Sequence, residues 1–363
     1  AYSLLDNPDA LGIVLNYPSQ SREALTKSKI KLNAQAPKII NSSIPCVGFI
    51  GAGNYASRIL IPAFKEAGVV LDTLVTSGGI SGVHHGNKNQ FVTASTETKD
   101  LWINDKINTV AIVTRHDAHA QQVLEALKSG KNVFVEKPLA LTLNDLDMID
   151  KAYHDANKSN TIRLMVGFNR RYAPHIVKMK ELLNSHKSAK SIIMTINAGA
   201  IPTEHWTQNS LIGGGRIIGE ACHFIDLMRH LIGHKIKGFT ATMMGNTPGI
   251  EVREDKTSIT LSFEDGSFGT IHYLANGGST FPKERIEVFC DDAVLQMDNY
   301  RVLTGYGWPR FKKMKLFRQD KGQKACVKAF TDSIINGKES PILYEELMES
   351  SRVSIEVANS LRN

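Results

Sequence analysis

The chain has 363 residues, of which 42% are hydrophobic and 22% are charged. This is the composition of an ordinary globular protein, and it excludes collagen, coiled coil and disorder for most of the chain. At about 150 residues per domain, the length predicts two domains or one large domain. The net charge of +7 suits an acidic small-molecule partner, such as a dinucleotide or a sugar nucleotide. The sequence has no Lys/Arg run of the kind that binds a phosphate backbone, so no nucleic-acid partner is expected.

The cysteines and the hydropathy exclude two further classes. The four cysteines form no Cys-x-x-Cys pair, so we expect neither a disulfide framework nor a metal site from Cys46, Cys222, Cys290 and Cys326. Reduced thiols indicate an intracellular, cytoplasmic protein. The sequence lacks any run of about 18 apolar residues, so no membrane-spanning helix and no membrane partner are expected.

Residues 1–43 are predicted to form an N-terminal arm and linker. Residues 10–17 favour a short strand after a turn, and residues 18–43 are polar with little periodicity. Because residue 1 is Ala, two interpretations stay open for this region: an arm packed on the chain, or the remnant of a preceding domain.

Residues 44–167 are predicted to form a dinucleotide-binding domain with a doubly wound parallel sheet, the Rossmann fold. Short apolar runs, typical of buried parallel strands, alternate in this region with amphipathic helices. The first helix has one apolar face that runs from Ala56 to Ala67 and includes Ile59, and a capping box at Thr142-x-x-Asp145 opens a later helix. Strands are expected at 47–50, 71–76, 109–114, 132–135 and 162–168.

Residues 168–322 are predicted to form a second α/β domain, built on a largely antiparallel open sheet and used for substrate binding and oligomerisation. Hydrophobicity alternates along short segments, and Asp265-Gly266 predicts a tight hairpin turn. A helix is expected at 224–232. Strands are expected at 191–197, 237–243, 258–263, 268–274, 285–290 and 294–297. Residues 323–363 are predicted to form closing helices, at 323–336 and 343–362, that pack back against the first domain.

A glycine-rich segment, Gly51-Ala52-Gly53-Asn54-Tyr55-Ala56, lies between the first strand and the first helix. In this pattern the first Gly allows a tight turn, the second lets backbone approach a pyrophosphate, and the small third residue lets helix and strand pack closely. The helix N-terminus also favours anions. The spacing therefore predicts a dinucleotide site at Gly51, Gly53, Asn54 and Tyr55, and a glycine turn without a ligand is the alternative.

The acid that commonly binds the adenosine ribose is missing from its expected place. It should end the second strand, about 20 residues after the glycines, where this chain has Thr76-Ser77-Gly78. Asp72 stands at the beginning of that strand. Ser77 is suited to either a ribose hydroxyl or a 2′-phosphate, so NAD and NADP both stay open, with NAD slightly favoured.

Two further segments carry candidate catalytic residues. Glu136-Lys137-Pro138 follows the fourth strand, and a lysine at that edge can hydrogen-bond a substrate hydroxyl and promote its deprotonation. His223 and Asp226 share a face at the start of a helix, and a carboxylate from Asp226 or Glu220 can orient the imidazole. The alternatives are a surface turn for the first segment and a capped helix with a structural histidine for the second.

Together these segments resemble the Gfo/Idh/MocA oxidoreductases over about residues 45–363. Besides the glycine segment, the matching motifs are Thr114-Arg115-His116-Asp117-Ala118-His119, Glu136-Lys137-Pro138, Gly167-Phe168-Asn169-Arg170-Arg171-Tyr172 and the block from Gly213 to Asp226. The resemblance implies that Lys137 contacts the reacting hydroxyl and the nicotinamide and that His223 acts as acid/base. It also implies that the dinucleotide lies along Thr114, Arg115, His119 and Glu136.

Three more residues are expected at the substrate: Arg171, Tyr172 and Trp206. Arg171 suits a phosphate or carboxylate and Trp206 a sugar ring, while a strand edge and a core aromatic are the alternatives.

One position departs from the family. Its members often carry an Asp four residues before the histidine, where this chain has Gly219 followed by Glu220. Both a substitution by Glu220 and an orienting role for Asp226 stay open.

The resemblance implies an NAD(P)-dependent oxidoreductase that transfers a hydride between nicotinamide and a secondary alcohol of a sugar, sugar nucleotide or cyclitol. A homodimer or homotetramer is expected. Residues 1–17 resemble the end of a zinc-dehydrogenase-like domain, as in bi-domain enzymes of surface-polysaccharide sugar metabolism. Two alternatives remain: a non-catalytic dinucleotide-binding regulatory protein on the same fold, and an enzyme that retains its cofactor through both half-reactions.

Overall fold

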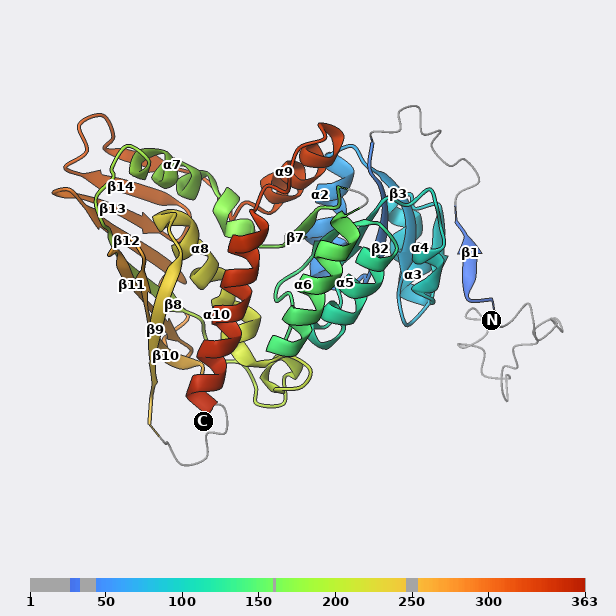
Figure 1. Cartoon of the computed structure of the whole chain (residues 1–363), viewed down its shortest axis with the longest axis horizontal. Coiled ribbons are helices and arrows are strands. Elements are labelled where there is room, and N and C mark those ends of the chain that lie inside the picture. The colour runs from blue at the N-terminus through green and yellow to red at the C-terminus, as the bar shows by residue number, and fades with distance from the viewer. Residues whose placement is uncertain (1–26, 33–43, 159–160, 246–253, 363) are drawn as a thin grey trace, which may run out of the picture.

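The computed structural model describes residues 27–32, 44–158, 161–245 and 254–362. Within these ranges the protein has two domains, each built on one sheet, with the long helix α10 (Tyr344–Arg362) running between them (Figure 1). The expected α/β architecture, a parallel sheet followed by a mostly antiparallel one, is confirmed. The strand expected at residues 10–17 lies outside the described residues. No helix in the described ranges is long and apolar enough to cross a membrane.

The first sheet is a Rossmann sheet with one added strand. Its order is β1-β4-β3-β2-β5-β6-β7, and every neighbouring pair is parallel except β1 with β4. The order reverses between β3-β2 and β5-β6, and ligands bind at such a reversal, beyond the carboxyl ends of the strands. The strands are β1 (Lys29–Lys31), β2 (Cys46–Ile50), β3 (Val70–Val75), β4 (Thr93–Ser95), β5 (Thr109–Ile112), β6 (Asn132–Val135) and β7 (Leu164–Val166).

The helices of this domain cover both faces of the sheet. Helix α6 begins at the expected capping box, where the Asp145 amide donates to Thr142 Oγ1 at 3.1 Å. The expected face of the first helix is wrong at one position, because Ile59 is 39% exposed whereas Ile61 is fully buried. A π-helical turn rotates the helix there. The helices are η2 (Ala56–Leu60, π), α2 (Ile61–Glu66), α3 (Ile80–Asn89), α4 (Lys99–Trp102), η3 (His116–Ala118, 3-10), α5 (His119–Lys128) and α6 (Leu143–Asn157).

The second sheet is open and eight-stranded, in the order β15-β14-β13-β12-β8-β11-β10-β9. Among the described strands of this sheet, β8 and β11 are the only parallel pair, and β10 and β11 form the expected hairpin. One face is buried, whereas the other exposes apolar side chains such as Ile193, Phe268 and Phe289. The strands are β8 (Ser191–Asn197), β9 (Ile236–Met243), β10 (Lys256–Phe263), β11 (Phe268–Leu274), β12 (Glu284–Cys290), β13 (Ala293–Asp298), β14 (Val302–Tyr306) and β15 (Lys313–Lys315).

Helices fill the space between the two sheets (Figure 1). Helix α9 packs on α2 of the first domain, and α10 packs on α8 of the second domain and on α6 of the first. An ion pair between Arg352 and Asp147 at 2.6 Å adds to the α10–α6 contact. The remaining helices are η4 (Asn169–Tyr172, 3-10), α7 (Pro174–Leu183), η5 (Trp206–Gln208, 3-10), η6 (Ile217–Ala221, π), α8 (Cys222–Ile232) and α9 (Gln323–Ile335).

The carboxyl ends of β2 and β5 approach each other closely at Gly51. This residue has φ +101°, and a Cβ on it would lie 2.3 Å from the carbonyl oxygen of Val113. A side chain is therefore excluded both by the backbone conformation and by space. The glycine allows the chain to turn out of β2 at the reversal of strand order.

The two glycines of this loop should respond differently to alanine. We expect Gly51→Ala to lower the free energy of unfolding by about 2–4 kcal/mol, because the methyl group meets backbone in a left-handed conformation. Gly53→Ala, with no heavy atom within 4 Å of its Cβ, is the matched control, with a loss below about 1 kcal/mol. Urea unfolding measures both, and equal losses would contradict this account.

Candidate active site

The residues expected to bind a dinucleotide gather at one edge of the first sheet. They follow the carboxyl ends of four parallel strands: β2, β3, β5 and β6. Topology alone brings them together, because parallel strands end on the same side of a sheet. These residues are Gly51, Gly53, Asn54 and Tyr55 after β2, Ser77 after β3, Thr114 and Arg115 after β5, and Glu136 and Lys137 after β6.

The loop after β2 leaves room for a ligand. Gly53, Asn54 and Tyr55 are exposed, and a Cβ on Gly53 would have no heavy atom within 4 Å. An open glycine backbone before a helix is where a pyrophosphate can bind. A nicotinamide dinucleotide is therefore a group that these residues fit.

A pocket of about 530 Å³ lies next to the end of β3. Its lining includes Lys27, Gly79, Ile80 and Thr96, and none of the described lining residues is acidic. Asp72, the nearest acid in the strand, is buried and accepts hydrogen bonds from Thr73 Oγ1 at 2.7 Å and Asn104 Nδ2 at 3.0 Å. This pocket therefore has a cation and lacks a carboxylate for a ribose.

Glu136 is a buried acid directly beside the candidate catalytic lysine. Burial raises the pKa of its carboxyl to about 7, although Lys137 and the Tyr55 hydroxyl act against this shift. Gly167 makes space for the carboxyl group, because a Cβ there would lie 2.7 Å from Glu136 Oε1. Glu136 thus connects the loop after β2 to the end of β6.

Lys137 joins the two domains. Its Nζ donates a hydrogen bond to the carbonyl oxygen of Gly219, in the second domain, at 2.6 Å. A second contact of the same kind between the domains joins His116 Nδ1 to the carbonyl oxygen of Gly213 at 2.8 Å. A Cβ on Gly219 would lie 3.0 Å from His116 Cε1, so the ring of His116 occupies the space that a side chain at position 219 would need.

His119, expected along the dinucleotide, is fully buried beneath the edge. Its Nδ1 lies 2.7 Å from the carbonyl oxygen of Pro138, and its Nε2 lies 3.2 Å from that of Thr114. Thr114 in turn donates its hydroxyl to Gln122 Oε1 at 2.8 Å. In this arrangement His119 fixes the loops after β5 and β6 relative to each other and has no nitrogen free for a ligand.

His223 lies at the beginning of α8, which carries it to the sheet edge. Its side chain is buried, and its Nδ1 has no hydrogen-bond partner among the described residues. Burial, reinforced by the positive charges of Arg170 and Lys137, lowers the pKa of this imidazole well below its usual range. His223 is therefore a neutral histidine with an unused nitrogen beside a lysine.

Glu220, a candidate acid for the same histidine, binds three other groups. It accepts hydrogen bonds from Arg216 Nη2 at 2.8 Å, from the Tyr273 hydroxyl at 2.6 Å and from Lys283 Nζ at 2.9 Å. Burial acts to raise its pKa, but these donors, with Lys283 the foremost, hold it well below the usual range. The carboxylate thus stays ionised and anchors the start of α8 to the second sheet.

Asp226 was expected to orient His223, and Arg171 was expected to bind the substrate. In the structure the two side chains form an ion pair with each other. Arg171 donates to Asp226 from Nε at 2.8 Å and from Nη2 at 2.7 Å, with both side chains buried. Arg171 also pairs with Glu346 of α10. A planar guanidinium that binds a carboxylate through two donors has little capacity left for a ligand. The pair connects η4, α8 and α10.

The two aromatic residues expected at the substrate differ in position. Trp206 is half-buried, packs edge-on against His116 with ring centroids 4.7 Å apart, and lies 5.8 Å from the guanidinium of Arg115. It therefore extends from the second domain over the loop after β5. Tyr172 is half-buried near Cys326 of α9, and burial raises the pKa of its hydroxyl well above the usual range.

Sequence reasoning missed a buried ion pair next to the site. Arg170 binds Glu284 through Nε and Nη2, both at 2.9 Å, and Lys321 adds a third contact at 2.6 Å. The Arg170 guanidinium also lies over the ring of Phe224, 4.9 Å from its centroid. Two adjacent arginines indicate anionic partners, but these partners come from α8, β12 and α10, at least 55 residues away in the sequence.

Comparison with known proteins identifies the family. Residues 46–168 match an oxidoreductase family with an NAD-binding Rossmann fold, and residues 177–296 match the GFO/IDH/MocA C-terminal domain. The two matches cover both domains of the structure, so the chain belongs to the Gfo/Idh/MocA family. The resemblance stated from the motifs is thereby confirmed for the family.

Named relatives are dehydrogenases and oxidoreductases. Oxidoreductase P35 of Formosa agariphila is 33% identical over 196 residues, which are 51% of this chain and 60% of that protein. Myo-inositol 2-dehydrogenase of Thermotoga maritima is 26% identical over 201 residues, which are 54% of this chain and 58% of that protein. The chain thus spans about three fifths of the length of these two relatives. A structure of levoglucosan dehydrogenase with NADH and levoglucosan has a TM-score of 0.75 at 18% identity, covers 87% of this chain and 97% of that chain, and shares the fold.

Burial of neutral histidines should make the protein less stable in mild acid. Burial lowers the pKa of His116 to about 3, so between about pH 6.5 and 3 the unfolded chain binds a proton that the folded chain does not. The contribution of His116 to the free energy of unfolding is therefore fully present above pH 6.5. Below that pH it falls by about 1.4 kcal/mol per pH unit. We expect His116→Gln to remove about this slope from urea-unfolding free energies.

His154→Gln is the control for this measurement, because the His154 side chain is 63% exposed. It should keep the wild-type slope between pH 7 and 5. A His116→Gln protein that loses stability in acid as steeply as wild type would show that His116 is protonated without penalty.

Proposed function

We propose that the chain is an NAD(P)-dependent oxidoreductase that oxidises a secondary alcohol of a sugar, sugar nucleotide or cyclitol, or reduces the corresponding ketone. The observation that carries the proposal is that Lys137 and His223 lie close together at the carboxyl-end edge of the first sheet, where the glycine-rich loop after β2 also lies. Lys137 is positioned by Gly219, and His223 is neutral with a free Nδ1. The named inositol and levoglucosan dehydrogenases, which share the family or the fold, support this class of substrate.

The chain's own residues would hold the cofactor along the strand ends. The open backbone of Gly53 would face the pyrophosphate, with Asn54 and Tyr55 beside it. Gly51, whose N–H donates to the carbonyl oxygen of Val75 at 2.9 Å, would turn the chain out of β2. Arg115 and Lys137 would lie near the nicotinamide half and Ser77 near the adenosine half. A bound nicotinamide supplies the carbon that accepts or donates the hydride.

His223 and Lys137 would handle the proton. In the oxidation, the substrate hydroxyl would give its proton to the neutral imidazole of His223. The carbon that bears this hydroxyl would give its hydride to the nicotinamide, which leaves a carbonyl group on the substrate. The ammonium of Lys137 donates a hydrogen bond to the reacting oxygen and favours the alkoxide character that develops there. Because the pKa of His223 is well below its usual range, the histidine is in its proton-accepting form at neutral pH.

Glu220 and Asp226 would be positioning residues in this scheme. Glu220 holds the start of α8 through its three donors, and Asp226 holds η4 through Arg171. Trp206, which packs on the loop after β5, would form one wall for a sugar ring. The substrate's polar groups then bind between this tryptophan and the Lys137–His223 pair.

Two variants test the proposal by separating binding from chemistry. Gly53→Asp should fold, because its Cβ has open space, but should abolish NADH and NADPH binding, because a carboxylate would occupy the pyrophosphate position. Lys137→Ala should bind dinucleotide within about threefold of wild type and lose about 100-fold or more in turnover. Fluorescence titration gives the affinities, and reduction of NAD⁺ or NADP⁺ with cyclitols, sugars and sugar nucleotides gives the rates.

Three outcomes decide between the candidate functions. Wild type that binds neither dinucleotide contradicts the proposal outright. Binding without turnover on any substrate of the panel favours a regulatory protein, for which Gly219 in place of the family's Asp is the motivating observation. Cofactor that co-purifies and is not released by dilution favours an enzyme that cycles with its cofactor retained.

The pocket at the end of β3 should decide between NAD and NADP. It offers Lys27 to a 2′-phosphate and no carboxylate to a ribose. We expect Lys27→Gln to weaken NADPH binding by about tenfold and NADH binding by less than about threefold, because only NADPH carries the phosphate.

Lys29→Gln is the matched control for this pocket. Lys29 lies two residues farther along the same segment, on β1, where its ammonium is 3.8 Å from Asp100. This variant should leave both affinities within about twofold of wild type. Equal losses of NADH and NADPH binding in the Lys27 variant would remove Lys27 from cofactor selection.

Other expectations stay predictions. A role in surface-polysaccharide metabolism and a zinc-dehydrogenase-like domain before residue 17 are two of them, and a cytoplasmic location is a third. Assembly into dimers or tetramers is another, for which the exposed apolar face of the second sheet, with Phe268 and Phe289, is the motivating feature.

A further inference from the structure

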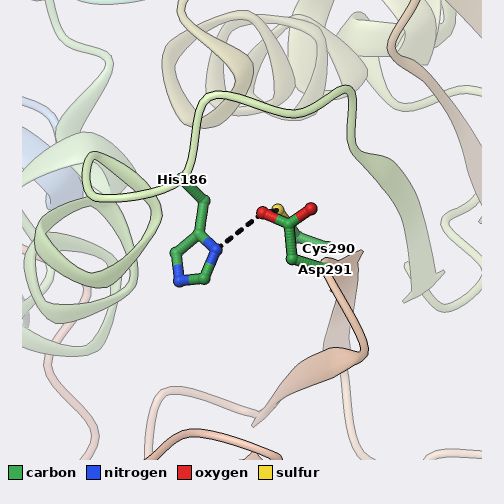
Figure 2. A group of neighbouring side chains, drawn as sticks. All are labelled: His186, Cys290 and Asp291. Atoms are coloured by element: carbon green, nitrogen blue, oxygen red, sulfur yellow. Dashed lines mark hydrogen bonds and ion pairs between the residues drawn. The ribbon is translucent and has the colours of Figure 1, made fainter.

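A histidine, a cysteine and an aspartate meet in the second domain (Figure 2). His186 lies in the loop between α7 and β8, Cys290 ends β12, and Asp291 begins the turn from β12 to β13. One potential ligand atom from each residue, His186 Nδ1, Cys290 Sγ and a carboxylate oxygen of Asp291, lies within 4.8 Å of the other two. None of them takes part in the oxidoreductase site described above.

Both donors of this cluster converge on one oxygen. His186 Nδ1 lies 2.7 Å from Asp291 Oδ2, and the Cys290 thiol donates to the same oxygen at 3.7 Å. Figure 2 shows the imidazole facing the carboxylate, with the sulfur close behind it. The hydrogen atoms on His186 Nδ1 and Cys290 Sγ form these two contacts. A metal ion that replaced both hydrogen atoms would bind the nitrogen, the sulfur and the carboxylate oxygen.

We propose that His186, Cys290 and Asp291 form a binding site for a divalent transition-metal ion of the zinc type. Nitrogen, thiolate sulfur and carboxylate oxygen are the ligands that Zn²⁺ and Co²⁺ take in proteins, with one solvent molecule able to complete a tetrahedron. Mg²⁺ and Ca²⁺ are excluded as natural occupants, because they bind sets of oxygen ligands.

The surroundings suit an ion that enters from solvent and then stays. The side chains of His186 and Asp291 are 27% and 38% exposed, whereas Cys290 is buried, so an ion could reach the site from solvent and bind a sulfur that is shielded from it. Trp308 packs edge-on against His186 with ring centroids 4.8 Å apart and limits the ring's rotation. Cys290 and Asp291 are held by the β12–β13 hairpin, in which Asp291 has φ +46°. The ligands are therefore placed before an ion arrives.

The charges that surround the site on the domain surface are positive. Lys180, Lys187 and Lys190 line a pocket of about 390 Å³ that also contacts His186. Their positive charges oppose a cation, so binding depends on the negative charge that the ligands supply. Thiolate and carboxylate together supply two negative charges, which balance one divalent ion. Binding would release the thiol proton and tie the loop before β8 to the hairpin.

Cobalt gives the sharpest test, because a Co²⁺–thiolate bond has its own near-ultraviolet absorption. The full chain is freed of metal with a chelator and titrated with CoCl₂ and, separately, with ZnCl₂. We expect wild type to gain the thiolate band at one ion per chain, to gain thermal stability with zinc, and to lose both on addition of EDTA. Cys290→Ser should lose the band, and Asp291→Asn should weaken binding by about tenfold or more.

Matched controls separate this site from adventitious binding. Asp292→Asn changes the next residue of the same turn, and Cys46→Ser removes a buried thiol of the first domain. Both should bind Co²⁺ like wild type, with the same band. Should Cys290→Ser fold poorly, His186→Ala serves instead, because this side chain lies on a partly exposed loop. A wild-type chain without the band, or ligand variants that bind as tightly as wild type, would overturn the proposal.

The result does not depend on the oxidoreductase assignment. Hydride transfer at Lys137 and His223 needs none of the three ligands, so dinucleotide binding should be the same with and without zinc. A chain that binds dinucleotide but no metal contradicts this inference alone, and one that binds metal but no dinucleotide contradicts the proposed function alone.

Discussion

The two domains meet through the backbone of a glycine-rich segment, and the candidate active site depends on this contact. The carbonyl oxygens of Gly213 and Gly219 receive His116 and Lys137 at 2.8 and 2.6 Å. Side chains would prevent the approach, because a Cβ on Gly213 would lie 2.3 Å from the Cα of Thr207 and one on Gly219 would crowd His116. The glycines thus fix how far Lys137 lies from the helix that carries His223. A site assembled from two domains needs such a constraint, since packing of each domain by itself leaves the distance between them free.

Buried charge in the second domain is paired, and the pairing separates structural groups from reactive ones. Arg170 with Glu284 and Arg171 with Asp226 are bidentate pairs whose side chains are nearly inaccessible. Removing one partner of such a pair leaves an uncompensated charge and costs several kcal/mol, about 3–5 in known cases. Glu220 is held by three donors in the same manner. Two of the four predicted catalytic residues, Glu220 and Asp226, and the predicted substrate residue Arg171 thus have structural partners. Lys137 and His223 are the two on which the proposed chemistry depends.

The sequence predicts the regular elements well and their partners poorly. Strands with strong patterns lie where expected, such as Asn132–Val135 and Ser191–Asn197. The short strand Thr93–Ser95 and the helix Ile80–Asn89, rich in Gly, His and Asn, carry no pattern that distinguishes them from loops. Ile59 was misplaced because a π-helical turn breaks the helical period that a pattern argument assumes. The sheet edge that gathers the predicted cofactor residues follows from topology. Contacts between side chains do not, since Arg171 and Asp226 are 55 residues apart and His186 and Asp291 are 105 apart.

Among the buried histidines at the domain junction, hydrogen bonding distinguishes their roles better than burial does. In each of them burial lowers the pKa and keeps the ring neutral. His119 has carbonyl oxygens close to both nitrogens and His116 has one at Nδ1, so their rings act as braces between loops. His223 has no partner at Nδ1 among the described residues. A buried polar atom without a partner costs about 1–3 kcal/mol, and such a cost is tolerated where a ligand supplies the missing bond. The proposed chemistry on a hydroxyl group therefore depends most directly on the unpaired nitrogen beside Lys137.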